Sequence, residues 1–125
     1  MRRGPVGYLA DVDPGNAEMR DAGREPVEAH RGGGDLLITV SGDVDLQTAP
    51  AIEDRMVDLI AAEGVGEIVL DLSKVEFFDS AGVRALVVAR REAETRHRPL
   101  TVSAVSPRCR RVLEVSGLDQ LFGLR

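Results

Sequence analysis

The chain has 125 residues, which suits one domain rather than two, and its 43% hydrophobic and 30% charged residues are typical of a globular protein. The formal net charge of −5 and the isoelectric point near 5.0 argue against nucleic acid and anionic membrane surfaces as main partners. No stretch approaches the roughly 20 apolar residues that span a bilayer. Cys109 is the single cysteine and cannot form an internal disulfide, so we expect a cytoplasmic protein.

The first part of the chain divides into an expected tail and two strands. Residues 1–25 mix Gly, Pro, Asp and Arg without helical or strand periodicity, so we expect a flexible tail before a folded domain over residues 26–125. The run Gly32-Gly33-Gly34 predicts a turn between strands at 27–31 and 36–41. Apolar residues alternate along the second strand, which predicts that one of its faces is buried.

A helix and a buried strand are expected next. Thr48 is predicted to cap the helix, with Pro50 in its first turn, and apolar residues then recur at helical spacing. Gly64 and Gly66 predict the end of this helix. The nearly continuous apolar run at residues 67–72 is typical of a strand that is buried on both faces.

The last third of the chain continues this alternation of helix and strand. An apolar stripe predicts a helix from Ser80 to about Arg96, followed by a strand at 100–104. The pair Ser106-Pro107 predicts the start of a final helix, and Gly117 predicts its end. The expected order is two strands, then helix, strand, helix, strand and helix, which places the chain in the α/β class with a small mixed sheet.

Residues 71–87 (DLSKVEFFDSAGVRALV) form the most informative segment. A connection containing Phe77-Phe78 is expected after the buried strand, and the next four residues, at 79–82, then open a helix. At a helix start the first backbone N–H groups lack helical partners and the helix dipole is positive. Ser80 therefore has two interpretations: a helix N-cap, which contributes about 1 kcal/mol, or a phosphoacceptor. A phosphate would add about −1.5 to −2 charges, which the helix terminus could accept but a partner docked over it would repel.

Three separated blocks of sequence carry a resemblance to a known family. They are SGDVDLQTAP at 41–50, VLDLSKVEFFDSAGVRALV at 69–87 and VLEVSGLDQLF at 112–122. In these blocks the chain resembles the STAS domain family and, within it, the bacterial anti-anti-sigma factors. The resemblance covers residues 27–125 and implies a small mixed sheet of roughly four to five strands with three to four helices.

The resemblance also implies a phosphorylation site. The family's phosphorylated serine lies in a DS-small-G sequence after the third strand, and this position is Ser80 here. Ala81 stands where many members have a second serine, so this motif offers only one hydroxyl. The family's Gly-acidic-x-Asp turn corresponds to residues 42–45, near the same surface. The implied partner-binding residues are Asp43, Asp45, Thr48, Asp79, Ser80, Ala81, Gly82 and Arg84.

A switch between partners is the function that this resemblance implies. The unphosphorylated chain would bind an anti-sigma factor, a serine kinase of the histidine-kinase-like ATPase fold, and would thereby release a sigma factor. The kinase would then phosphorylate Ser80 and dissociate, and a serine phosphatase would reset the system. ATP and magnesium would belong to the kinase, so we expect no cofactor in this chain.

An enzyme activity of the chain's own is not expected. A serine hydrolase would need a base within hydrogen-bond reach of Ser80, whereas His97 lies about 25 Å away if one helix joins the two residues. His30 is not excluded by this distance, but the GxSxG elbow is missing. Two isolated histidines and one cysteine also lack metal-ligand spacing, so we expect no metal site.

One cysteine, one arginine cluster and one alternative role remain to be considered. Cys109 is expected to be a small buried hydrophobic residue rather than a reactive thiol. Arg108, Arg110 and Arg111 are expected to form a solvated face, with a partner or anion contact as the alternative. The alternative role keeps the fold and makes the chain an accessory subunit of a membrane transport assembly, or a scaffold in a signalling complex. The DSAG sequence at 79–82 favours the phosphorylated switch.

Overall fold

The computed structural model describes residues 25–62 and 64–124. The tail that the sequence predicts at residues 1–25 therefore lies outside the described residues, except for its last residue. Four strands and three helices follow in the predicted order. Their bounds are β2 Val27–Gly32, β3 Asp35–Val44, α2 Ala49–Ala61, β4 Ile68–Phe78, α3 Ser80–Thr95, β5 Leu100–Val105 and α4 Pro107–Val115.

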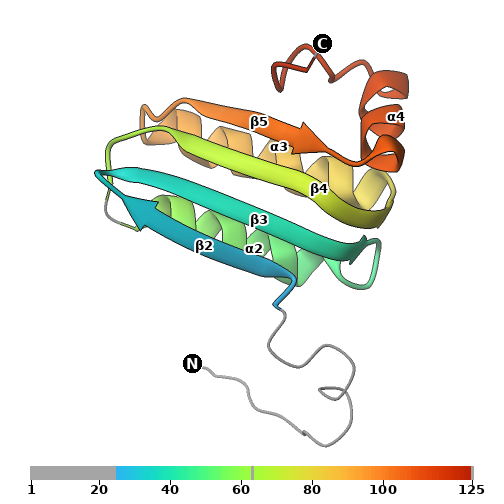
Figure 1. Cartoon of the computed structure of the whole chain (residues 1–125), viewed down its shortest axis with the longest axis horizontal. Helices are drawn as coiled ribbons and strands as arrows, with labels where there is room; N and C mark the ends of the chain where they lie inside the picture. The colour runs from blue at the N-terminus through green and yellow to red at the C-terminus, as the bar shows by residue number, and fades with distance from the viewer. Residues whose placement is uncertain (1–24, 63, 125) are drawn as a thin grey trace, which may run out of the picture.

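The sheet is mixed, with the strand order β2-β3-β4-β5 (Figure 1). β2 and β3 are antiparallel neighbours, whereas β3, β4 and β5 run parallel to one another. The hairpin between β2 and β3 turns at Gly33 and Gly34, whose φ angles of +61° and +91° suit glycine. The predicted α/β class and small mixed sheet are confirmed.

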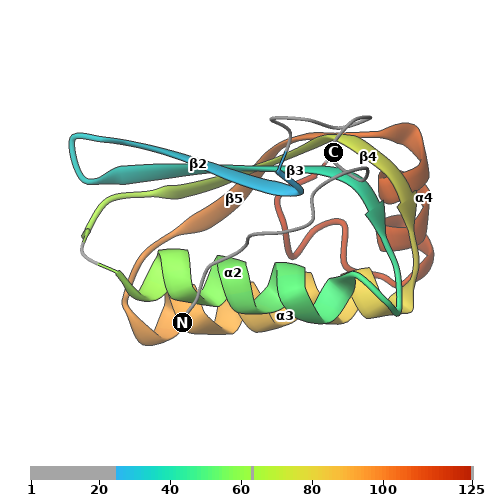
Figure 2. The same cartoon turned by 90° about the horizontal axis from the view of Figure 1, so that it is seen from below.

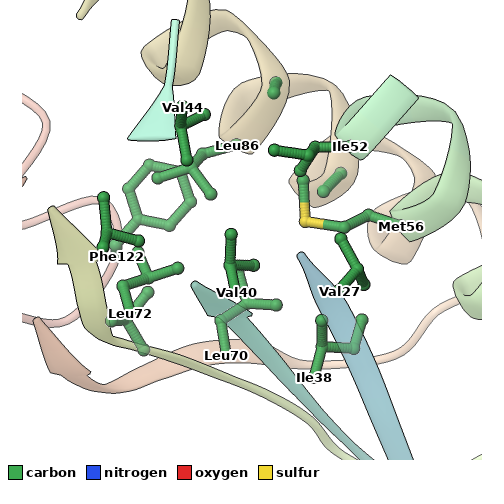
Figure 3. Packing of buried hydrophobic residues seen from close by; sticks show 14 of the residues in the cluster. Val27, Ile38, Val40, Val44, Ile52, Met56, Leu70, Leu72, Leu86 and Phe122 are labelled. Atoms are coloured by element: carbon green, nitrogen blue, oxygen red, sulfur yellow. The ribbon is translucent and has the colours of Figure 1, made fainter. Parts of the chain in front are cut away.

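Helices α2 and α3 lie side by side over one face of the sheet (Figure 2). Between these layers lies a core that is almost entirely aliphatic. Phe122, from the segment after α4, joins this core and is 1% exposed. Residues that Figure 3 shows in the cluster are Val27, Ile38, Val40, Val44, Ile52, Met56, Leu70, Leu72, Leu86 and Phe122.

The parallel strands place three helix starts at one edge of the sheet. The carboxyl ends of β3, β4 and β5 lead directly toward α2, α3 and α4, so the starts of these helices share that edge. We call this the carboxyl edge. The opposite side, where β3, β4 and β5 begin, is the amino edge. None of the helices in residues 25–62 and 64–124 is long and apolar enough to cross a membrane.

β4 is longer than the sequence predicts. The strand was expected to end at residue 72, with Phe77-Phe78 in a connection, but it continues to Phe78 because its second half still pairs with β3. Register shifts in this pairing break the alternation of buried and exposed residues. The pattern that marks a half-buried strand is therefore absent from residues 73–78. Helix α2 ends at Ala61, before Gly64 and Gly66, which were predicted to end it.

Candidate site at the carboxyl edge

Ser80 is the first residue of α3 and is exposed. The predicted exposed position at a helix start is confirmed. Its interpretation as the N-cap is wrong, because Asp79 occupies that position and the Asp79 carboxylate accepts a hydrogen bond from the Ala81 N–H (2.9 Å). Among the described residues, no hydrogen bond involves the Ser80 hydroxyl, so this group is available at the surface.

Asp79 satisfies most of the N–H groups in the first turn of α3. Its side chain accepts from Ala81, and its backbone carbonyl accepts from Gly82 (2.9 Å) and Val83 (3.1 Å). Three of the four N–H groups at residues 79–82 thus have acceptors: those of Ala81 and Gly82 donate to Asp79, and the Asp79 N–H donates to the Val44 carbonyl (3.3 Å). The positive end of the helix dipole remains available to new negative charge there.

The connection between β3 and α2 is closed by its own hydrogen bonds. The Asp45 carboxylate accepts from the backbone N–H groups of Gln47 and Thr48, each at 3.0 Å. The Thr48 amide, together with the Thr48 hydroxyl and the Gln47 amide, lowers the pKa of Asp45 below its ordinary value of 3.8, against a partial opposing effect of desolvation. The Thr48 hydroxyl donates to the Asp43 carbonyl (2.8 Å) and accepts from the Asp45 N–H (2.9 Å).

These bonds correct the predicted role of Thr48. Thr48 does precede α2, but its backbone is already helical and its side chain makes no capping hydrogen bond. The hydroxyl is directed back toward residues 43 and 45, where it holds the turn. The Gly-acidic-x-Asp turn is therefore fixed by its own hydrogen bonds. Asp43, the acidic residue of this turn, is exposed.

The two motifs meet where the ends of β3 and β4 pair. Val44 lies opposite Phe78, and the Asp79 N–H donates to the Val44 carbonyl (3.3 Å). The turn at residues 42–45 and the start of α3 are thus joined by the sheet. The structure brings these two parts of the predicted site together at one edge.

Gly82 is buried and allows α3 to approach β4 closely. A Cβ atom at this position would lie 2.5 Å from the Phe78 ring, a distance at which something must shift. The other buried residues of α3 are Ala85, Leu86, Ala89 and Ala93, so this side of the helix carries mostly small side chains. Gly82 consequently contributes to the site by positioning the helix, not by offering a side chain to a partner.

Arg84 extends from the next turn of α3, and its side chain is 75% exposed. Its Nε lies 3.5 Å from Oε1 of Glu53, on α2, so the pair links the two helices at the surface. Sequence reasoning predicted Arg84 as a partner contact and missed Glu53. The helical spacing in α2 indicated only that Glu53 faces water.

Exposed apolar residues at the same edge were also missed. Leu46, in the turn before α2, is 78% exposed, and Phe77, near the end of β4, is 40% exposed. The Arg108 guanidinium lies 5.6 Å from the centre of the Phe77 ring, a cation–π contact. The sequence feature that could have indicated the exposure of Leu46 is its position between two polar residues in a turn.

A groove of about 760 Å³ adjoins the turn on the side of β2. Asp43 and Thr48 line it together with Glu76 and Arg55. The charged residues that line the groove are three carboxylates, Glu25, Asp43 and Glu76, and one arginine, Arg55, so the groove is mostly negative.

The cysteine and the arginine cluster lie on α4. Cys109 is 0% exposed, which confirms the prediction of a buried residue, and burial raises the pKa of its thiol to about 12. Arg108 and Arg111 are exposed, in agreement with a solvated face, while Arg110 pairs with Glu114 (3.8 Å).

Comparison with known proteins identifies the family. The model of a family described as "Mlab, STAS domain" matches residues 27–124. The chain belongs to the STAS domain family. A curated relative in this family, the anti-sigma-F factor antagonist RsfB of Mycobacterium tuberculosis, is 33% identical over 91 residues, which cover 73% of each chain.

Solved structures agree with this assignment. An anti-sigma factor antagonist from Mycobacterium paratuberculosis has a TM-score of 0.69 and 32% identity, covering 78% of this STAS chain and 82% of its own. The unphosphorylated form of the anti-sigma factor antagonist SpoIIAA has a TM-score of 0.65 and 23% identity, covering 75% of this chain and 83% of its own. The second likeness concerns the fold alone.

Proposed function

We propose that this STAS protein is an anti-sigma factor antagonist whose binding is switched off by phosphorylation of Ser80. The names of its relatives, which are anti-sigma factor antagonists, support the role. The observation that carries the switch is the exposed Ser80 hydroxyl at the start of α3, beside the turn at residues 42–45 that the Thr48 hydroxyl holds.

The other hydroxyls near the carboxyl edge are poorer acceptors. The Thr48 hydroxyl is half-buried and engaged in the turn. The Ser73 hydroxyl donates to the Asp71 carboxylate (2.7 Å), and Ser106 is buried and caps α4. A kinase would have to break these interactions before transfer. Ser80 requires no such rearrangement.

The proposed switch acts on docking rather than on folding. The kinase transfers the γ-phosphoryl group of ATP to the Ser80 oxygen, ADP leaves, and the hydroxyl proton passes to the kinase. The product carries about −1.5 to −2 charges at a surface that already holds Asp43 and Asp79. A partner that had buried this surface would have to desolvate or repel the new charge. Because Ser80 is exposed, the core need not move.

The proposed partners are proteins. An anti-sigma factor that is itself a serine kinase of the histidine-kinase-like ATPase fold would bind the unphosphorylated form and release a sigma factor. A serine phosphatase would restore the hydroxyl. Since sigma factors act with RNA polymerase, the proposed place of action is the bacterial cytoplasm.

The decisive experiment combines modification with binding. The chain is incubated with its candidate kinase and ATP, and the modified residue is mapped by mass spectrometry. We expect phosphate on Ser80 alone, persistent kinase binding by Ser80→Ala, and at least about tenfold weaker binding by Ser80→Asp, which corresponds to about 1.4 kcal/mol. Ser73→Ala is the matched control and should be modified and bound like the parent. Phosphate on Thr48 or Ser73 with Ser80 unmodified would refute the proposal.

The same experiment separates the alternative role. An accessory subunit or scaffold would hold its partner equally well with and without phosphate on residue 80. Equal affinity of the two forms for the kinase would therefore reject the switch and favour the adaptor.

A further inference from the structure

The phosphate proposed for Ser80 would lack most of the backbone donors that a helix start normally offers. Asp79 already binds the N–H groups of Ala81 and Gly82, and its own N–H donates to the Val44 carbonyl. The Asp79 carboxylate also lies next to the modified residue and would repel a dianion. A side-chain cation must therefore balance the added charge if it is to be held against the protein.

Arg84 is placed to supply that cation. It follows Ser80 by four residues in α3, and side chains at this spacing lie on the same face with Cβ atoms about 5–6 Å apart. Long helical side chains lean toward the helix N-terminus, which directs Arg84 toward Ser80. The guanidinium presents several N–H donors in a planar fork that matches phosphate oxygens.

The current partner of Arg84 is held weakly enough to be exchanged. The Arg84 side chain is 75% exposed, and its Nε is 3.5 Å from the Glu53 carboxylate. Ion pairs in water contribute little because solvent screens them. A phosphate carries more charge than one carboxylate and offers three acceptor oxygens. The phosphate should therefore win the competition for Arg84.

We infer that phosphorylation of Ser80 exchanges one ion pair for another: Arg84 leaves Glu53 on α2 and binds the phosphate on its own helix. This inference rests on the proposed modification of Ser80 and adds an internal partner for it. Phosphorylation then alters the docking surface twice, by adding a dianion and by withdrawing an exposed arginine. Glu53 is left as an unpaired carboxylate beside them.

The test uses the full chain with phosphoserine installed at position 80 during synthesis, so it does not depend on a kinase. The pKa of the phosphate is read from a titration of its ³¹P chemical shift. A bound cation favours the dianion and lowers this pKa. We expect Arg84→Gln to raise it by roughly half a pH unit.

Two further variants define the exchange. Arg91→Gln removes the same charge from an exposed position on α3. This position is about 16 Å from Ser80 along the helix axis, beyond the screening length of about 10 Å at 0.1 M salt. This variant should leave the pKa unchanged. Glu53→Gln frees Arg84 and should lower the pKa, with a smaller effect when Arg84→Gln is also present.

The outcomes separate this inference from the proposed function. Equal phosphate pKa values in the Arg84→Gln and Arg91→Gln proteins would overturn the internal partner, even if a kinase modifies Ser80. A Glu53→Gln effect that is the same with and without Arg84 would overturn the exchange. Failure of the kinase to modify Ser80 would instead refute the proposed switch, while the titration of the installed phosphoserine would still report on Arg84.

Discussion

The two edges of the sheet hold their polar groups in opposite ways. At the amino edge, Arg98 is 3% exposed, and its guanidinium donates to the carbonyls of Gly34 and Gly66, each at 2.9 Å. These bonds tie the hairpin turn and the start of β4 to the residues before β5. At the carboxyl edge, Ser80 and Arg84 are directed into solvent.

This difference separates a structural cluster from the proposed functional one. Polar groups in the interior need partners within the chain, because an unsatisfied buried group costs about 1–3 kcal/mol. Nε and Nη2 of Arg98 have such partners, whereas its buried Nη1 has none among the described residues. The paired groups at the amino edge therefore contribute to folding. The exposed groups of the carboxyl edge stabilise the fold little, so they can be altered by modification or by a partner without unfolding the domain. Substitution of buried polar groups at the amino edge should therefore lower the free energy of unfolding more than substitution of exposed groups at the carboxyl edge.

The largest effect is expected at Arg98. Arg98→Ala removes the donor to both carbonyl groups and leaves a cavity. The free energy of unfolding should therefore fall by about 3 kcal/mol. Urea unfolding followed by circular dichroism measures this loss. Arg91→Ala, at an exposed position on α3, should change the value by less than about 0.5 kcal/mol. Similar stabilities for the two variants would show that Arg98 does not hold the amino edge.

A glycine at each edge provides the next comparison. A Cβ atom at Gly66 would lie 2.9 Å from the Gly34 backbone, and one at Gly82 would lie 2.5 Å from the Phe78 ring. Overpacking of this kind costs about 1–3 kcal/mol, so both alanine variants should be destabilised. Alanine recovers up to about 1 kcal/mol of helix propensity at Gly82 alone, so Gly66→Ala should lose more in urea unfolding. A more stable Gly82→Ala protein would contradict the close contact of α3 with β4.

The sequence predicted the elements of this fold because its apolar residues recur with clear periods. Leu36, Ile38 and Val40 alternate in β3 and are all buried. Prediction failed where periodicity fails, in the second half of β4, because register shifts against β3 replace the alternation with irregular burial. Three buried residues of α3, Gly82, Ala85 and Ala89, were also missed, since alanine and glycine carry little hydrophobic signal.

The site was predicted in position but not in its contacts. The DSAG sequence indicated that Ser80 lies at a helix start, because this segment stands between a buried strand and an apolar stripe with helical spacing. Which residue caps the helix depends on backbone angles, and the sequence could not choose between Asp79 and Ser80. The Arg84–Glu53 pair joins two helices, and such contacts depend on the crossing of α2 and α3, which no local pattern encodes.

A smaller loss of stability is expected at the cap of α3. Asp79→Ala removes the acceptor of the Ala81 N–H, so the free energy of unfolding should fall by about 1 kcal/mol. Asp54→Ala, at an exposed position within α2, serves as the control and should be close to neutral. If the Asp79 variant matched the control, the N-terminus of α3 would not depend on this carboxylate. Serine at residue 80 would then be able to take over the cap.

The smallest effect concerns the acid response of the turn before α2. The pKa of Asp45 is lowered below 3.8 in the folded chain, mainly by the Thr48 amide, so its carboxylate stabilises the fold above that pH and loses this contribution as the pH falls below it. The difference in unfolding free energy between the parent and Asp45→Asn should therefore be larger at pH 6 than at pH 3. Asp54→Asn is the control. An equal difference at both pH values would mean that the turn does not bind the ionised carboxylate preferentially.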